Sequence, residues 1–298
     1  MQTIRLKKKR DCGHLIGKEP SDSEYDAVID PPARIVRNNG GLTDSVLGVY
    51  LKLPPKALKI MGHIARYAKT TKGLRTYGLP MNSAIFGALP RIEIRQNYCR
   101  LTRNSVEQRD LMALVLDFAG DIAKLYEKHL PGEYGRHLKM SVQDVLTEWL
   151  LPDTPFSTVN FNLNHAIRYH RDRANQKGVM SNVIITRQNV EGGLLVLPEY
   201  QVALRQGDGA LIIFDGQAVV HGVTPIQFGE NGYRCSVVFY TLRGMKNCYP
   251  YAEEFERAKV DRTRIEDEYR TELSRESIRK SVKLMDSAIV KRGKREKA

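Results

Sequence analysis

The alternation of hydrophobic and polar positions changes character near residue 156. Short β-rich runs separated by turns fill about residues 156–243, and this spacing is typical of a protein built from sheets. The runs are Phe156–Tyr169, Met180–Thr186, Gly193–Leu197, Gln201–Leu204, Ala210–Phe214 and Tyr233–Leu242. We predict a double-stranded β-helix, the jelly-roll class, in which two sheets face each other and inward-facing strand residues can hold a metal at the mouth.

From about residue 53 to 150 the spacing of apolar residues is helical. A capping box at Ser105 and Gln108 opens a helix that Pro131-Gly132 ends, and its apolar stripe is Leu111, Leu114, Val115, Phe118, Ile122 and Leu125. A shorter helix is expected after Ser141, with an inward face made by Val142, Val145, Leu146 and Trp149. Stripes of this kind favour packing against a sheet.

The two ends of the chain differ from this middle part. Lys7–Arg10, the Pro31-Pro32 pair and the turn residues around 38–41 indicate an irregular arm, and the segment 253–298 is charged with helical spacing. We therefore expect an α+β fold with four regions: a basic irregular arm (1–45), a helical support region (46–155), a double-stranded β-helix catalytic core (156–245) and a charged helical tail (246–298).

Charge favours a polyanionic partner. Lys and Arg number 47 against 34 Asp and Glu, which gives a net charge of +13. Nucleic acid is the first candidate, and a generally basic, well-solvated protein is the alternative. Two interpretations also apply to the basic arm and to the tail after Arg275: these segments either contact phosphates or are simply solvated.

The cysteines and the length of the apolar runs indicate the cellular compartment in which the protein works. Cys12, Cys99, Cys235 and Cys248 form no Cys-x-x-Cys pair, so we expect neither a zinc site nor a disulfide framework, and a reducing interior fits best. No apolar run reaches membrane-spanning length. We expect a soluble intracellular protein, cytoplasmic or, in a nucleated cell, nuclear, with no membrane and no evident protein partner.

His170, Asp172 and His221 are the residue types of a non-haem Fe(II) site. Two histidines and one carboxylate occupy one face of an octahedron and leave the opposite face open. His-x-Asp supplies two ligands from one short stretch, and His221 follows 49 residues after Asp172, enough chain for a meander of strands to return. A His-x-Asp pair by itself is also common by chance, and buried histidines often have only ordinary hydrogen bonds.

Arg234 and Ser236 extend this pattern on a strand-like run. The guanidinium fork of Arg234 can hold one carboxylate of a dicarboxylic acid such as 2-oxoglutarate. Ser236, two residues on, points to the same face of a strand. These five residues in this order favour an Fe(II) oxygenase site over a metal-binding barrel with another role.

Four motifs carry a family resemblance: His170–Asn175, Gly192-Gly193 with Pro198-Glu199, His221–Pro225 and Arg234–Tyr240. In these motifs the chain resembles the TET/JBP family of 2-oxoglutarate- and Fe(II)-dependent nucleic-acid dioxygenases, including its minimal phage and bacterial members. The resemblance covers residues 156–243 well and the helical part loosely. It implies that His170, Asp172 and His221 bind Fe(II), that Arg234 and Ser236 hold 2-oxoglutarate, and that O₂ is the second cosubstrate.

The resemblance also implies substrate contacts. Asn175 stands where TET-like enzymes place an amide that hydrogen-bonds the target base, and Tyr240 stands where they place a stacking ring. Without the resemblance, Asn175 is a loop residue and Tyr240 a core residue. Leu242 replaces a His of the TET pattern. The chain also has neither the cysteine-rich region of the animal enzymes nor the glucosylated-base-binding domain of the trypanosome ones, so we expect a minimal catalytic unit.

The expected reaction is hydroxylation of the 5-methyl group of 5-methylcytosine in DNA, on a flipped-out or single-stranded base. The loss of a polar side chain at Leu242 keeps thymine open as the alternative base, with 5-hydroxymethyluracil as product. A hydroxylase of proteins or small metabolites remains a further alternative, because the triad and the arginine are shared across the oxygenase superfamily.

Overall fold

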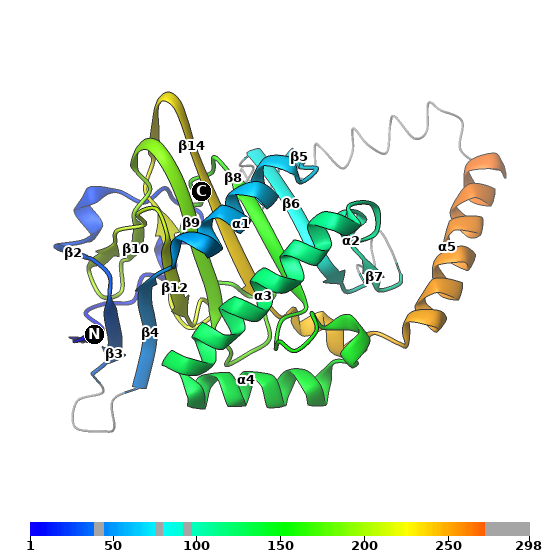
Figure 1. Cartoon of the computed structure of the whole chain (residues 1–298), viewed down its shortest axis with the longest axis horizontal. Helices are drawn as coiled ribbons and strands as arrows, with labels where there is room; N and C mark the ends of the chain where they lie inside the picture. Colours follow the sequence, from blue (N-terminus) through cyan, green and yellow to red (C-terminus); the bar gives the residue numbers. More distant parts are fainter. Residues whose placement is uncertain (39–44, 75–79, 92–96, 272–298) are drawn as a thin grey trace.

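The computed structural model describes residues 1–38, 45–74, 80–91 and 97–271. Its centre is a pair of facing sheets, and helices cover the outer side of the larger sheet (Figure 1). The large sheet has ten strands in the described part of the chain: β1 (Gln2–Leu6), β3 (Ala33–Arg37), β4 (Ser45–Lys52), β12 (Ala210–Phe214), β9 (Ser181–Gly192), β14 (Ile226–Tyr240), β8 (Thr158–Leu163), β6 (Pro80–Leu89), β5 (Thr71–Leu74), and β7 (Arg100–Leu101) paired with β6.

The smaller sheet contains β13 (Gly222–Val223), β10 (Leu195–Leu197), β11 (Val202–Leu204) and β2 (Ala27–Ile29). Its buried side chains share one core with the inner face of the large sheet; Leu195, Leu197 and Leu204 pack in the same cluster as Ile185 and Ile212. Two facing sheets of this kind are the predicted double-stranded β-helix.

Alternate residues of the central strands face different layers. Val237 lies opposite Ile184, and both belong to the core beneath the helices. Ser236 lies opposite Ile185, which packs toward the smaller sheet. Because side chains alternate along a strand, Arg234, Ser236 and Tyr240 all lie on the inner face.

Helices α1 (Pro55–Tyr67) and α3 (Arg109–His129) cross the outer face of the large sheet (Figure 1). The predicted stripe of α3 is confirmed: Leu111, Val115, Phe118 and Ile122 are buried against β9 and β14, and Leu114 and Leu125 are partly buried beside them. Their burial is the main stabilisation of this layer, at about 1.5–3 kcal/mol for each fully buried apolar side chain.

The predicted helix boundaries in this region are wrong at the start of the long helix and at the helix expected after Ser141. Thr102, not Ser105, caps the short helix α2 (Arg103–Glu107), since its hydroxyl accepts a hydrogen bond from Ser105 N at 3.3 Å. Helix α3 ends just before Pro131, as predicted. Pro131 also begins α4 (Pro131–Asp144), because a proline at the first helical position loses no hydrogen bond, so the helix expected after Ser141 is instead the end of α4, followed by the 3₁₀ turn Thr147–Trp149. Val142 and Leu146 are exposed, while Val145 and Trp149 are buried as predicted.

Residues 46–155 are also less helical than expected, because β4, β5, β6 and β7 extend the large sheet there. The N-terminal segment is not irregular. It forms β1, β2 and β3 and the short 3₁₀ helices Gly13–Leu15 and Asp22–Glu24, and β1–β3 and β2–β11 are parallel pairs. Edge strands that pair with distant partners leave little local pattern, which explains why the sequence did not indicate them.

The expectation of unpaired cysteines is wrong for one pair. Cys99 and Cys248, 149 residues apart, form a disulfide, whereas Cys12 and Cys235 are free and buried. Glu254 lies beside this disulfide, buried, and accepts hydrogen bonds from Arg91 Nη2 at 2.7 Å and from the backbone N of Cys99 and Tyr249 at 2.9 Å each. These contacts fasten the start of α5 (Tyr251–Thr271) to β7.

Helix α5 then projects away from the sheets (Figure 1). It is charged, as predicted for the tail, and Phe255 and Val260 are exposed on it. The basic run after Arg275 lies outside the described residues. Within them, no helix combines the length and the apolar character needed to cross a membrane.

Candidate active site

His170 and His221 face each other at the mouth between the two sheets. They form an isolated antiparallel bridge, with His170 N donating to His221 O at 2.9 Å and His221 N to His170 O at 3.0 Å. Asp172 follows two residues later and its backbone N donates to Gly216 O at 2.9 Å. Backbone pairing therefore brings the three predicted ligands together.

The side chains of the triad converge on one point. His170 Nε2 lies 3.4 Å and His221 Nε2 3.8 Å from Asp172 Oδ1, and one ligand atom from each residue lies within 4.8 Å of the others. Adjacent ligands of an octahedral ion with bonds of about 2.1 Å are about 3 Å apart, so a small contraction fits these atoms to Fe(II).

The tautomer of each histidine suits metal binding. Nδ1 of His170 lies 2.8 Å from Arg168 O, and Nδ1 of His221 lies 3.1 Å from Val219 O. A carbonyl only accepts, so in each neutral ring Nδ1 carries the hydrogen and Nε2 keeps its lone pair for a metal.

The charge states of the triad also suit a divalent cation. Burial, together with the neighbouring His170, lowers the pKa of His221 to about 4, so the ring is neutral at pH 7. Burial alone would raise the pKa of Asp172, but its interactions with His170 and His221 and the hydrogen bond from Ser181 outweigh burial and lower the pKa to about 2. The site thus offers a divalent cation the neutral ring of His221 and the carboxylate anion of Asp172.

A short chain of hydrogen bonds holds the carboxylate of Asp172. Ser181 Oγ donates to Asp172 Oδ2 at 3.1 Å, and Asn175 Nδ2 donates to Ser181 Oγ at 3.0 Å. Gly216 leaves room for the carboxylate, because a Cβ at that position would lie 2.2 Å from Asp172 Oδ2. Neither Ser181 nor Gly216 was predicted, since a lone serine and a lone glycine carry no spacing pattern.

Arg234 lies on the inner face of β14, only 1% exposed. Nη1 donates to His165 O at 3.2 Å and Nη2 donates to Gln206 Oε1, while the buried Nε has no hydrogen-bond partner among the described residues. Burial and the nearby Arg187 lower the pKa of Arg234 to about 10. A buried guanidinium without a carboxylate partner is costly, which fits a site completed by an anion such as 2-oxoglutarate.

Three other predicted residues lie around this mouth. Ser236 is buried next to Arg234 on the inner face of β14. Tyr240, further along that face, is half-buried. Asn175 is buried, and its backbone pairs with that of Leu242, which is half-buried. The predicted base-contacting residue Asn175 and the position where Leu242 replaces a histidine of the TET pattern therefore lie side by side.

The structure also adds two polar residues that the prediction did not assign. Gln206 orients Arg234, and Glu199, buried, contacts the segments that carry the triad. Gln206 lies in a turn whose sequence indicated only a turn. Glu199 belonged to a recognised motif but had no role there.

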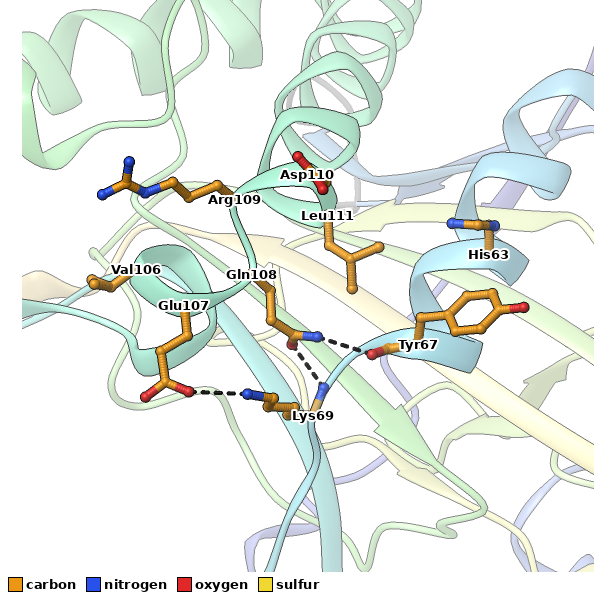
Figure 2. A pocket seen from close by; sticks show the side chains of 9 residues that line it. All are labelled: His63, Tyr67, Lys69, Val106, Glu107, Gln108, Arg109, Asp110 and Leu111. Carbon is orange, nitrogen blue, oxygen red and sulfur yellow. Dashed lines mark hydrogen bonds and ion pairs between the residues drawn. The ribbon is translucent and has the colours of Figure 1, made fainter.

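A hollow of about 670 Å³ lies elsewhere, between the end of α1 and the start of α3 (Figure 2). None of the predicted site residues lines it. Several of its polar groups pair with one another: Lys69 Nζ contacts Glu107 Oε2 at 3.1 Å, and Gln108 bonds to Lys69 N and Tyr67 O. This internal pairing leaves the triad as the better candidate site.

Comparisons with known proteins agree with this geometry. A curated sequence relative is the bifunctional helicase and thymine dioxygenase JBP2 of Leishmania braziliensis, 25% identical over 220 residues, which cover 72% of this chain and 20% of the relative. The corresponding protein of Trypanosoma brucei brucei is 28% identical over 123 residues, 41% of this chain and 11% of its own. The chain thus spans a fifth or less of these relatives.

Among solved structures, NgTET1 in complex with 5mC DNA is similar with a TM-score of 0.57 and 16% identity, covering 83% of this chain and 84% of NgTET1. At this identity the similarity shows the shared fold. The model of the Tet_JBP family, described as the oxygenase domain of the 2OGFeDO superfamily, matches residues 93–243. The chain therefore belongs to the TET/JBP family of oxygenases, which are dioxygenases that depend on Fe(II), 2-oxoglutarate and O₂.

Proposed function

We propose that this chain hydroxylates the 5-methyl group of 5-methylcytosine in DNA. In this proposal His170, Asp172 and His221 hold the iron, and Arg234 and Ser236 hold 2-oxoglutarate. The observation that carries it is the triad with Nε2 atoms 3.4 and 3.8 Å from Asp172 Oδ1, on the same side of the large sheet as a buried, incompletely paired Arg234. With O₂, Fe(II) and 2-oxoglutarate supply the oxidation of an unactivated C–H bond.

The residues of the chain position the reactants. Arg234 pairs with the far carboxylate of 2-oxoglutarate, and its planar fork, fixed by Gln206 and His165 O, sets the direction of the bound acid. Ser181 keeps Asp172 in one orientation. Ile185, which pairs with Ser236, and Leu197 belong to the apolar cluster between the sheets, and apolar side chains beside the site favour the exclusion of water.

DNA as the substrate is supported by charge and by similarity. The net charge of +13 suits a polyanion, and NgTET1 has a similar fold and was solved with 5mC DNA. A base within a duplex does not reach a metal at the mouth of a jelly roll, so the target base is flipped out or lies in a single strand.

The preference for cytosine is supported by the orientation of Asn175. Asp172 only accepts hydrogen bonds, so the Ser181 hydroxyl donates to it and must accept from the NH₂ group of Asn175. With its NH₂ group bonded to Ser181, the amide keeps its carbonyl oxygen as the atom that can accept a hydrogen bond. The exocyclic amino group of cytosine is a donor, whereas the equivalent group of thymine is a carbonyl. Tyr240 supplies a face on which the base stacks.

Thymine is the second candidate. Leu242, next to Asn175 in the structure, offers no polar group to the base, and an apolar wall discriminates weakly. The curated relatives named above are thymine dioxygenases. These observations favour 5-hydroxymethyluracil as the product to test beside 5-hydroxymethylcytosine.

The experiment that separates the two uses oligonucleotides that contain both 5-methylcytosine and thymine. The protein is incubated with Fe(II), ascorbate, 2-oxoglutarate and O₂, and the nucleosides are counted by mass spectrometry. The proposal expects 5-hydroxymethylcytosine as the main product. If 5-hydroxymethyluracil is the main product, thymine and not 5-methylcytosine is the substrate. If neither product forms while the protein still turns over 2-oxoglutarate on another substrate, the assignment of DNA as the substrate is refuted.

A further inference from the structure

The carboxylate of Glu199 is buried, 1% exposed, directly after β10, and takes no part in binding 2-oxoglutarate or a base as proposed above. It accepts three hydrogen bonds from segments far apart in the sequence. Val220 N donates to Oε2 at 3.0 Å, while Arg171 Nη2 at 3.1 Å and Lys8 Nζ at 2.7 Å donate to Oε1.

Two of these partners belong to the segments that carry the triad. Arg171 lies between His170 and Asp172, and Val220 immediately precedes His221. One carboxylate therefore joins the His-x-Asp segment to the strand segment of the distal histidine. Displacement of either partner moves a ligand residue that is one peptide away.

The third partner, Lys8, comes from the N-terminal segment. Its side chain is 47% exposed, and the next residue, Lys9, donates its backbone N to Glu199 O at 2.9 Å. Glu199 is an anion between two cations, which makes its burial tolerable. Loss of Lys8 would leave the carboxylate with Arg171 as its only cationic partner among the described residues.

The rest of the N-terminal segment packs behind the same two histidines. Gly17 N donates to Tyr169 O at 2.8 Å, and Tyr169 N donates to Lys18 O at 2.9 Å. Cys12 and Leu15 are buried in one cluster with Tyr169 and Val220. Tyr169 and Val220 are the residues that precede the two histidine ligands.

We propose that Glu199 is a positioning residue of the metal centre, and that Lys8 completes its contacts. Glu199 keeps the two ligand-bearing segments at the separation that the metal requires. The N-terminal segment stabilises the same two segments through its contacts with Tyr169 and Val220. This inference rests on the proposed iron site at His170, Asp172 and His221. It gives Lys8 a role other than contact with phosphate.

Metal affinity tests the inference without turnover. Co(II), which does not oxidise in air under mild conditions, is titrated into the full chain and followed by its visible absorption, with melting temperature measured in parallel. The variants are Glu199→Gln, which keeps size and one acceptor, Glu199→Ala, and Lys8→Met. Lys9→Met is the matched control, because Lys9 Nζ pairs with Asp26 at 3.2 Å on the exposed surface.

Partners of ligand residues typically change metal affinity about 10- to 100-fold when removed. We expect a weakening in this range for Glu199→Ala, about tenfold for Glu199→Gln, a smaller but measurable weakening for Lys8→Met, and no change for Lys9→Met. Lys8→Met, at a half-exposed side chain, keeps the test valid if Glu199→Ala does not fold.

Unchanged Co(II) affinity in both Glu199→Gln and Lys8→Met overturns the inference. His170→Ala separates its failure from that of the proposed function. If His170→Ala abolishes Co(II) binding while the Glu199 and Lys8 variants match the wild type, only the positioning role is wrong. If His170→Ala also binds Co(II) normally, the iron site itself is wrong.

Discussion

Replacement of Arg234 by lysine tests how the chain holds 2-oxoglutarate. Arg234 is 1% exposed, its two Nη atoms are fixed by His165 O and Gln206, and its Nε is buried without a partner among the described residues. Lysine keeps the positive charge but lacks the planar fork, so at least one charge-assisted hydrogen bond to the acid is lost.

The expected magnitude follows from that single bond. A hydrogen bond to a charged group contributes about 1.5–3 kcal/mol, which corresponds to a Kd for 2-oxoglutarate that is about 10- to 100-fold weaker. Metal affinity should change little, because Arg234 is not a ligand. Because Arg234 is 1% exposed, bulk water does not readily replace the missing donor.

Calorimetric titration of 2-oxoglutarate into the Co(II)-loaded protein measures this effect directly. Arg205→Lys is the control, since Arg205 is exposed and its Nε contacts Asp30 Oδ1 at 2.8 Å. A Kd of Arg234→Lys within twofold of the wild type would refute the reasoning and assign the acid to another cation. An equal rise of the Kd for 2-oxoglutarate in Arg205→Lys would show that any Arg-to-Lys replacement weakens binding, without direct contact between Arg234 and the acid.

Four more substitutions test other parts of the structure. His221→Ala should abolish Co(II) binding and 2-oxoglutarate turnover, and normal binding in a metal titration would exclude His221 as a ligand. Gly216→Ala should weaken Co(II) at least about tenfold, because its Cβ would lie 2.2 Å from Asp172 Oδ2; an unchanged Kd would show that the carboxylate can shift freely. Burial lowers the pKa of His137 from 6.5 to about 3, so the unfolded state takes up a proton first as pH falls below 6.5, and stability is lost on acidification. Urea unfolding should therefore show that His137→Leu loses about 2 kcal/mol less than the wild type between pH 7.5 and 5, and parallel pH profiles would contradict this. Leu242→His should increase the ratio of 5-hydroxymethylcytosine to 5-hydroxymethyluracil in nucleoside counts, and an unchanged ratio would show that position 242 does not contact the base.

The parts of the site that could be predicted from sequence are those with a local signature. His170 and Asp172 are two residues apart, and Arg234 and Ser236 share one face of a strand, so spacing alone relates them. The strand Ala210–Phe214 was predicted to the residue because all five of its side chains are buried and apolar. The stripe of α3 was predicted for the same reason, since burial repeats at helical spacing.

What the sequence could not indicate depends on distant partners. Cys99 meets Cys248 only because β7 and the segment before α5 are brought together in the fold. The sequence predicts Lys8 as part of a solvated or DNA-binding run, whereas in the structure its amine contacts the buried Glu199, 191 residues away. Strands β1 and β2 of the N-terminal segment pair in parallel with β3 and β11, and such pairing leaves no periodic pattern in a short segment.

Oxidation of a single 5-methylcytosine is the most direct test of the proposed function. The full chain is incubated with Fe(II), ascorbate, 2-oxoglutarate, O₂ and an oligonucleotide that carries one 5-methylcytosine, and the intact strand is weighed by mass spectrometry. Asp172→Ala is the matched control, because it lacks the carboxylate ligand. We predict that the wild type adds one oxygen atom at the methylated base, with one succinate formed for each oxygen added, and that Asp172→Ala adds none. An unmodified strand with the wild type, under conditions in which it consumes 2-oxoglutarate, would contradict the proposal.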